Sequence, residues 1–208
     1  MGGAREDLLA AEVELMQARE RVAEMRRKLP AEPVDDYELT VTRAGSTEPP
    51  ESKRLSELFT APDRTLVLMQ FMLGEAQTAP CPMCSMWADG YNGVVSHLEQ
   101  RVDFGIVAAA DATELRNLAE SRGWDNLMLV SSAGTSLKTD LGMQDDQGNQ
   151  WPGVSVFRLE DGRPVHHYTG GAHLTGDHWR GVDLLSPLWH FLDLTPEGRG
   201  DWMPSLSY

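Results

Sequence analysis

Two nearly continuous apolar segments constrain the fold of this chain more than any other feature of its sequence. Residues 65–73 and 102–110 are almost uninterrupted runs of hydrophobic side chains. A strand with one wet face alternates polar and apolar residues, whereas a strand that is buried on both faces is apolar throughout. Strands of that kind need helices on both faces of their sheet. We therefore predict an α/β fold built around a central sheet.

The rest of the chain predicts helices and strands that alternate around these two segments. An Asp161-Gly162 pair between apolar stretches is a strong signal for a β-hairpin. Asp111 stands where a helix beginning at residue 112 needs a capping side chain. We expect strands at 37–42, 127–131, 154–159 and 165–168, helices at 55–59, 81–101, 112–122 and 183–192, and loops at 45–52 and 141–150. This order implies a mixed central sheet flanked by helices.

The N-terminal segment predicts one long helix, over residues 4–29, that ends at Pro30. Its apolar residues have the spacing of a coiled-coil seam over about three heptads: Leu8, Ala11, Leu15, Ala18, Val22, Met25 and Leu29. Because so short a seam is marginal alone, two interpretations stay open: a homodimer through this helix, or packing across its own domain. We expect an N-terminal helical extension (1–33), a domain (34–195) and a C-terminal tail (196–208).

The charge of the chain excludes two classes of partner. Among 208 residues, 32 are acidic and 18 are Lys or Arg, so the formal net charge is -14. Such a surface repels nucleic-acid phosphates and anionic lipid, and we expect neither a nucleic-acid nor a membrane partner. The first residues are charged rather than apolar, and the longest apolar run is too short to cross a bilayer. We therefore expect a cytoplasmic protein.

The two cysteines, Cys81 and Cys84, lie between the first apolar segment and the following helix. Structural disulfides are rare in the cytoplasm, where such a pair more often serves redox chemistry or metal binding. The N-terminus of a helix favours a thiolate, and Pro82 suits a first helical position. The spacing also lets the second thiol attack a mixed disulfide formed by the first. We predict that Cys81 is the catalytic nucleophile and Cys84 the resolving thiol.

A zinc site is the competing interpretation of the cysteine pair. It would need two further ligands, and the available histidines have spacings that match no ligand signature: His166, His167, His173 and His178. No glycine-rich phosphate loop follows any predicted strand, so a nucleotide site is unsupported. We expect neither a metal nor another cofactor.

The order of elements and three stretches of sequence resemble thioredoxin and its relatives. The stretches are residues 67–71, the motif Cys81-Pro82-Met83-Cys84, and residues 151–157 with the hairpin behind them. More narrowly, the chain resembles a bacterial thioredoxin-like family described only as a domain of unknown function. Residues 81–90 and 192–199 carry that resemblance, which extends over nearly the whole chain. It implies a thioredoxin-like fold with an N-terminal helical extension.

The resemblance also implies residues that bind substrate. In thioredoxins a cis-proline loop lies beside the cysteines, which implies a cis Trp151-Pro152 bond and contacts of both residues, with Pro82, to an extended substrate. The alternative for Pro152 is an ordinary proline that opens a strand. Thr78-Ala79-Pro80-Cys81 resembles the Thr-x-x-Cys motif of peroxiredoxins. That motif implies that Thr78 orients a peroxide.

Two departures from the thioredoxin pattern keep several functions open. Gln70 stands where reductases have a buried aspartate, and a neutral amide cannot act as a general base. Pro80 replaces the tryptophan that usually precedes the first cysteine. We predict a thiol–disulfide oxidoreductase with a thiol or disulfide protein as substrate. The alternatives are a peroxiredoxin-like peroxidase that uses Cys81 on a small peroxide, and a non-enzymatic thioredoxin-like binding module.

Overall fold

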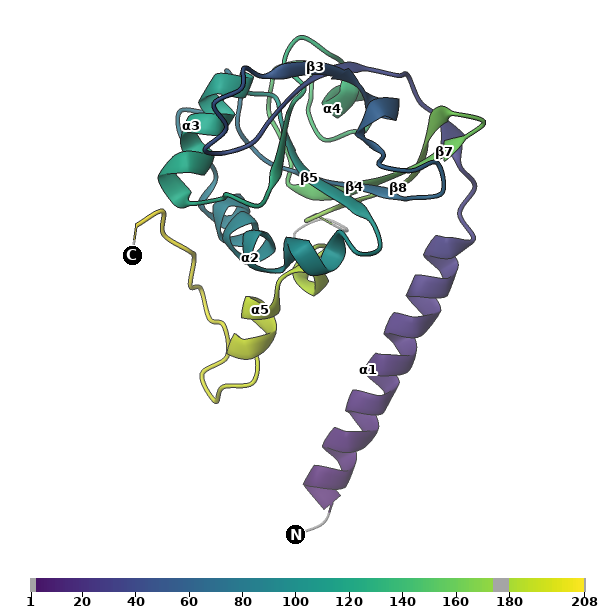
Figure 1. Cartoon of the computed structure of the whole chain (residues 1–208). Coiled ribbons are helices and arrows are strands. Elements are labelled where there is room, and N and C mark those ends of the chain that lie inside the picture. Colours follow the sequence, from purple (N-terminus) through teal and green to yellow (C-terminus); the bar gives the residue numbers. More distant parts are fainter. Residues whose placement is uncertain (1–2, 174–179, 208) are drawn as a thin grey trace.

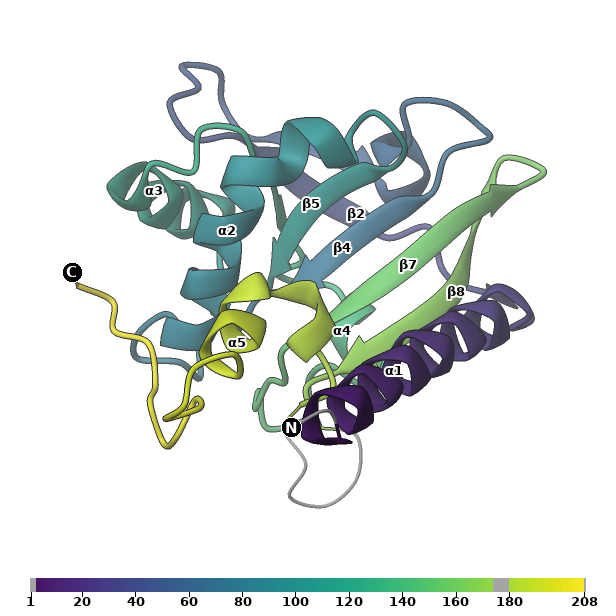
Figure 2. The same cartoon turned by 90° about the horizontal axis from the view of Figure 1, so that it is seen from below.

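The computed structural model describes residues 3–173 and 180–207 and confirms the predicted α/β architecture. Within them, an eight-stranded mixed sheet runs in the order β1-β8-β7-β4-β5-β6-β2-β3. Figure 1 shows this sheet between layers of helices. The central strands β4 (Leu66–Gln70), β5 (Asp103–Ala108) and β6 (Met128–Ser131) are parallel to one another. On the other side of β4, the strand β7 (Gly153–Glu160) pairs antiparallel with it (Figure 2).

The remaining elements complete the sheet and its covering layers. The outer strands are β1 (Glu32–Pro33), β2 (Glu38–Thr42), β3 (Glu51–Arg54) and β8 (Arg163–Gly171). The α-helices are α1 (Gly3–Arg27), α2 (Pro82–Leu98), α3 (Ala112–Arg122), α4 (Leu137–Asp140) and α5 (Pro187–Leu192), and the 3-10 helices are η1 (Leu55–Leu58) and η2 (Asp183–Leu185). No helix among the described residues is long and apolar enough to cross a membrane.

Helices cover both faces of the sheet, as the two apolar segments require. Along β4, Met69 packs into the core that includes α2 and α3, whereas Leu66 and Leu68 pack into the core that includes η1 and α4. Figure 1 shows α2 and α4 on opposite sides of the sheet. The first apolar segment is thus buried on both sides, and it ends beside the start of α2.

Local signals predicted α3 and the hairpin correctly. The carboxylate of Asp111 accepts a hydrogen bond from the backbone N–H of Thr113 at 2.8 Å, and the helix ends at Gly123 with a φ of +69°. At the hairpin, Asp161 and Gly162 have φ values of +51° and +76°, the left-handed pair that a two-residue turn between twisted strands requires.

Two elements lie where the sequence predicts none. Residues 51–54, half of them placed in a loop by the sequence, form the edge strand β3, whose exposed polar side chains carry no apolar pattern. The single turn of α4 lies in a stretch without a predicted element. Both are too short, or too polar, to have a detectable periodicity.

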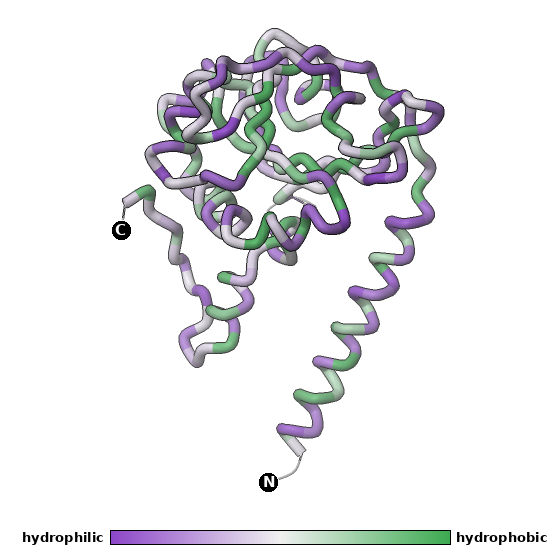
Figure 3. Tube along the Cα trace, in the orientation of Figure 1, coloured by the Kyte–Doolittle hydropathy of each residue, from purple (hydrophilic) through white to green (hydrophobic). Residues whose placement is uncertain are grey.

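The helix α1 projects away from the rest of the molecule (Figure 1) and has no buried residue. Hydrophobic and hydrophilic residues are interleaved along it (Figure 3). Only its last turn has a described contact, where the guanidinium of Arg26 lies 5.0 Å from the ring centroid of Tyr168. Packing across its own domain is therefore wrong, while self-association stays a prediction. The predicted three-part division also stays a prediction, although β1, within the predicted extension, pairs with β8.

The predicted cis bond between Trp151 and Pro152 is wrong, because the described residues contain no cis peptide bond. Pro152 instead directly precedes Gly153, the first residue of β7, close to what the alternative interpretation expected. Its carbonyl accepts a hydrogen bond from the backbone N–H of Ala172 at 3.0 Å, which continues the β7–β8 pairing. A proline is tolerated at such a position, because the N–H that it lacks is not needed for the strand pairing.

Candidate redox site

The start of α2 positions both cysteines. Cys81 is the N-cap residue of the helix, and Pro82 occupies its first turn. The backbone N–H of Cys84 points at the sulfur of Cys81 with an N···Sγ distance of 3.5 Å. The backbone and the hydroxyl of Ser85 both donate to the carbonyl of Cys81 at 3.0 Å. The capping geometry thus directs the free N–H groups of the first turn towards one sulfur atom.

The thiol of Cys81 is the more acidic of the two. The thiol of Cys84 donates a hydrogen bond to the Cys81 sulfur, and this bond is the main cause that lowers the pKa of Cys81 from 9.0 to about 6. Burial opposes the effect, and the backbone N–H groups of Cys84 and Met83 add to it. Cys81 is partly exposed and carries a free sulfur. At neutral pH it is therefore a thiolate that a reactant can reach.

The environment of Cys84 acts in the opposite direction. The residue is fully buried, and burial is the main cause that raises the pKa of its thiol well above 9.0, followed by the hydrogen bond to Cys81. The backbone N–H of Met72 and the ammonium of Lys138 oppose this rise. At neutral pH Cys84 is consequently a protonated thiol that donates to its neighbour. The two cysteines thus form an asymmetric pair.

Gln70 is buried at the end of β4, where the thioredoxin pattern has an aspartate. Its side-chain nitrogen donates to the hydroxyl of Ser155 at 3.0 Å, and Ser155 is bonded in turn to Thr169 at 2.8 Å. The side-chain oxygen of Gln70 has no partner among the described residues. The side chain is tied to β7 and β8, and it brings no titratable group to the cysteines.

Lys138 is a residue of this site that sequence reasoning missed. Its side chain is 2% exposed, and its Nζ donates to the carbonyl oxygen of Phe71 at 2.8 Å. Burial lowers the pKa of its ammonium from 10.5 to about 7, and the charge of Cys84 opposes that fall. Lys138 belongs to α4, a single helical turn between two loops. A lysine in such a segment carries no sequence signal that it is buried. Only the tertiary structure brings it to the end of β4.

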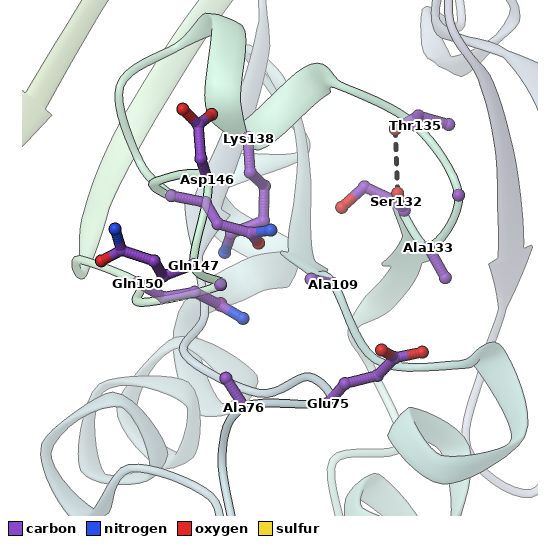
Figure 4. A pocket seen from close by; sticks show the side chains of 13 residues that line it. Glu75, Ala76, Ala109, Ser132, Ala133, Thr135, Lys138, Asp146, Gln147 and Gln150 are labelled. Carbon is purple, nitrogen blue, oxygen red and sulfur yellow. Dashed lines mark hydrogen bonds between the residues drawn. The ribbon is translucent and has the colours of Figure 1, made fainter.

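A cavity of about 400 Å³ opens at the carboxyl ends of the three parallel strands. Loops that follow β4, β5 and β6 contribute its walls, and residues 144–150 close another side (Figure 4). Lys138 is one of the lining residues, together with Gln150, whose side-chain nitrogen donates to the carbonyl of Leu73 at 3.2 Å. Clefts at this edge of a parallel sheet are common ligand sites. The cysteines do not line it.

The predicted substrate-binding residues Pro82, Trp151 and Pro152 lie at the start of α2 and just before β7. Pro82 is exposed next to Cys81. Because Gln70 pairs with Gly153, the chain at Trp151 and Pro152 comes beside the end of β4, from which the loop to the cysteines departs. The substrate roles of these three residues stay predictions.

Thr78, which the peroxiredoxin motif implies as a peroxide-orienting residue, lies on the surface. Its side chain is exposed, and the described residues include no hydrogen-bond partner for its hydroxyl. The hydrogen bonds to the Cys81 sulfur come instead from Cys84 and from backbone N–H groups. The predicted contact of Thr78 with substrate therefore stays a prediction without a partner in this structure.

Among the described residues, the histidines considered as zinc ligands do not form a metal site with the cysteines. Within residues 3–173 and 180–207, no group of three or more potential ligands is placed to hold a metal ion. His166 lies on β8 and is bonded through Nε2 to the hydroxyl of Thr169 at 2.7 Å. His178 lies outside the described residues.

The sequence as a whole matches a known family model. Residues 2–207 match the family described as bacterial protein of unknown function, DUF899. The chain belongs to this family. The DUF899 match extends over the long N-terminal helix, the cysteine motif and the C-terminal segment, and it confirms the narrower resemblance found from the sequence. No curated protein matches the chain.

Solved structures that resemble this DUF899 chain include peroxiredoxins of low sequence identity. The mitochondrial 2-Cys peroxiredoxin of Plasmodium falciparum has a TM-score of 0.52 and 10% identity, with coverage of 78% of this chain and 93% of that one. Reduced Prx3 of Vibrio vulnificus in complex with hydrogen peroxide has a TM-score of 0.51 and 15% identity, with coverage of 77% and 96%. Prx1a of Plasmodium yoelii has a TM-score of 0.50 and 11% identity, with coverage of 83% and 98%. These likenesses show a shared thioredoxin-type fold.

Proposed function

We propose that this protein is a thiol–disulfide oxidoreductase in which Cys81 attacks and Cys84 resolves. The observation that carries the proposal is the asymmetry of the pair: a partly exposed Cys81 whose pKa is lowered to about 6 accepts a hydrogen bond from a buried Cys84 whose pKa is raised. Thiolates, not thiols, attack disulfides, so a neutral solution holds the outer sulfur ready for reaction. We place this reaction in the cytoplasm, which would keep both thiols reduced.

The exchange consists of two balanced steps. The Cys81 thiolate forms a bond with one sulfur of a substrate disulfide, and the other substrate sulfur leaves as a thiolate. Cys84 then loses its proton to the departing sulfur, bonds to the sulfur of Cys81 and releases the second substrate sulfur as a thiolate, which takes a proton from solvent. One substrate disulfide is reduced to two thiols, and one disulfide forms within the protein. The reverse direction oxidises a dithiol substrate by the same steps.

Two features of the fold support a docking place for the substrate. Pro82 is exposed beside the attacking sulfur, and the Trp151-Pro152 segment lies beside the end of β4. We propose that these three residues contact the polypeptide of a thiol or disulfide protein. The lowered pKa of Cys81 argues against a binding module with idle cysteines, which would have no use for a stabilised thiolate.

A peroxidase is the second candidate, favoured by the fold shared with peroxiredoxins, one of which was solved with hydrogen peroxide. In that reaction the Cys81 thiolate takes one peroxide oxygen as a sulfenic acid and the other oxygen leaves as water after protonation. Cys84 then condenses with the sulfenic acid, releasing a second water and forming the disulfide. The exposed, unbonded side chain of Thr78 gives this candidate less support than disulfide exchange.

The reduction potential of the cysteine pair tests the proposal. The reduced protein is equilibrated in dithiothreitol buffers, trapped by alkylation and analysed by mass spectrometry. We expect a reversible intrachain disulfide with a potential between about -270 and -120 mV, the range of working thiol–disulfide enzymes. C84S should instead accumulate a mixed disulfide on Cys81. C81S should form neither the intrachain disulfide nor the mixed disulfide. If no intrachain disulfide forms, the exchange mechanism is wrong.

A peroxide assay separates the two candidates. Hydrogen peroxide should oxidise Cys81 no faster than it oxidises a free thiol of similar pKa if the protein is specialised for disulfide exchange. Oxidation that is orders of magnitude faster than that reference would favour the peroxidase. C84S serves as the matched variant, because it retains the nucleophile and lets the sulfenic acid accumulate.

A further inference from the structure

Within the described part of the chain, the buried amino group of Lys138, whose pKa is lowered to about 7, has no buried counter-charge. No carboxylate there lies at ion-pair distance from its Nζ, and its hydrogen bond goes to the carbonyl of Phe71. A buried ammonium is costly, because the protein interior replaces its hydration poorly. Among the described titratable groups, the one with which it interacts is Cys84.

One peptide group joins Lys138 to Cys84. The carbonyl of Phe71 and the N–H of Met72 are the two ends of the same planar peptide unit. Lys138 donates to the oxygen end at 2.8 Å, and the N–H end donates to the sulfur of Cys84. An ammonium at the carbonyl oxygen polarises the peptide group and makes its N–H a stronger donor. The cation and the thiol therefore act on the two ends of one dipole.

We propose that Lys138 is the positioning residue of the resolving step, and that it stabilises the Cys84 thiolate through the Phe71–Met72 peptide group. The inference rests on the proposed function. Once Cys81 is bonded to substrate, it no longer carries the charge that accepts the Cys84 proton. Cys84 must then ionise in a buried position before it attacks Cys81. The ammonium is the nearby positive charge that compensates the new negative one.

Among the described residues around Cys84, no other group suits this task. Gln70 is neutral and is bonded to Ser155. Tyr91 faces Cys84 from α2, but burial raises the pKa of its phenol, so it stays neutral. Lys138 comes from α4, and it also lines the cavity, as Figure 4 shows, so there is room for solvent beside its side chain. In the thioredoxin pattern a buried carboxylate lies near the resolving thiol. Here Lys138 of α4 lies near Cys84 instead.

The two steps can be separated with dithiobis(nitrobenzoate) as the disulfide. Attack by Cys81 releases one thionitrobenzoate, and attack by Cys84 on the mixed disulfide releases the second. K138M removes the charge at nearly constant size, and K138Q removes the charge but keeps a hydrogen-bond donor. K53M is the matched control, because Lys53 lies on the edge strand β3 and pairs only with the exposed Glu51.

We expect both Lys138 variants to slow the second release and to leave the first within about twofold of wild type. Each unit of rise in the pKa of Cys84 should slow resolution about threefold, because the loss of thiolate outweighs its higher nucleophilicity. The pH midpoint of the second release should also move upwards. K53M should match wild type in both releases. The proposal would be overturned if both Lys138 variants fold and release the second thionitrobenzoate at a rate within twofold of wild type. It would also be overturned if K138Q, which lacks the charge, released it at the wild-type rate.

A titration that needs no variant of Lys138 gives an independent test. In C81S, an NMR titration of the ε carbon of Lys138 should show an inflection at the pH at which Cys84 ionises, because coupling between two groups is reciprocal. Absence of that inflection would contradict the coupling. If wild type releases only one thionitrobenzoate, the proposed function itself fails; if it releases two and the variants do likewise at equal rates, only the role of Lys138 fails.

Discussion

Cys81 and Cys84 carry the same side chain three positions apart, and their surroundings make them different acids. Cys81 caps the helix and accepts hydrogen bonds from the first turn, while Cys84 lies one turn further into the core. The hydrogen bond between the two sulfurs lowers one pKa and raises the other. The difference between nucleophile and resolving thiol is therefore a matter of position along one turn of helix.

The pH dependence of alkylation should reveal this difference. The rate at which iodoacetamide modifies Cys81 should rise with pH around a midpoint of about 6, because only the thiolate reacts. C84A removes the main hydrogen-bond donor and should move the midpoint upwards, whereas C84S keeps a donor and should move it less. Mass spectrometry of quenched samples gives the rates. A midpoint near 9 in wild type would contradict the environment described for Cys81.

The cap of α3 offers a test of local stability. D111A removes the bond from the Thr113 N–H to the Asp111 carboxylate. We expect a loss of about 1 kcal/mol in the free energy of unfolding, measured by urea denaturation. D125A removes the same charge from an exposed position without a described bond, and it should change stability by less than about 0.5 kcal/mol. Equal effects of the two substitutions would rule out a contribution from the cap.

Among the elements, α1 combines an apolar seam with almost complete exposure. Its seam residue Leu15 is 52% exposed and Met25 is 69% exposed. A helix of this length with no buried face is marginal in water, since most helical stability in proteins comes from packing. Association with a second copy of the helix would cover the seam.

We predict that α1 mediates dimerisation and that L15E weakens it. A charge in the seam should raise the dissociation constant of the dimer about tenfold or more, since burial of a leucine contributes about 1.5–3 kcal/mol. Q17E introduces the same charge two positions along, on the other side of the helix, and should leave the constant unchanged. Sedimentation velocity over a range of concentrations measures both. A wild-type monomer at high concentration would refute the prediction.

At the scale of the whole molecule, the stability of the reduced protein should depend on pH. The pKa of Cys81 is about 6 in the folded protein and 9.0 in the unfolded chain. Between these two pH values the folded state binds fewer protons than the unfolded state, so the free energy of unfolding rises with pH. Lys138 acts in the same direction between about 7 and 10.5, because its buried ammonium loses its proton. The raised pKa of Cys84 has an effect only above 9.0.

Urea denaturation under reducing conditions checks this prediction. The free energy of unfolding should increase steadily from about pH 6 to about pH 9, and fall as the pH is lowered through the same range. C81S should flatten the lower part of the curve and K138M the upper part. A wild-type curve that is flat or declines over this range would show that neither group titrates as its surroundings require.

Much of the fold could be predicted because its signals are local. Two apolar runs indicated the central strands, Asp111 marked the start of a helix, and Asp161-Gly162 marked the hairpin. Edge strand β3 and the short α4 escaped prediction, because exposed polar strands and single turns carry no periodic pattern. The cysteines were assigned to a helix start for the same local reason, a strand before them and Pro82 between them.

The sequence alone determined the α/β fold, the family resemblance and the position of a cysteine pair at the start of a helix, since each depends on residues close together in the chain. The tertiary structure decided that Cys84 is fully buried, that Pro152 precedes its strand in the trans form, and that Lys138 bonds to Phe71, 67 positions away. These properties depend on burial and on contacts between distant segments. No local pattern encodes a buried charge, because the energy of that charge depends on the groups that the completed fold places around it.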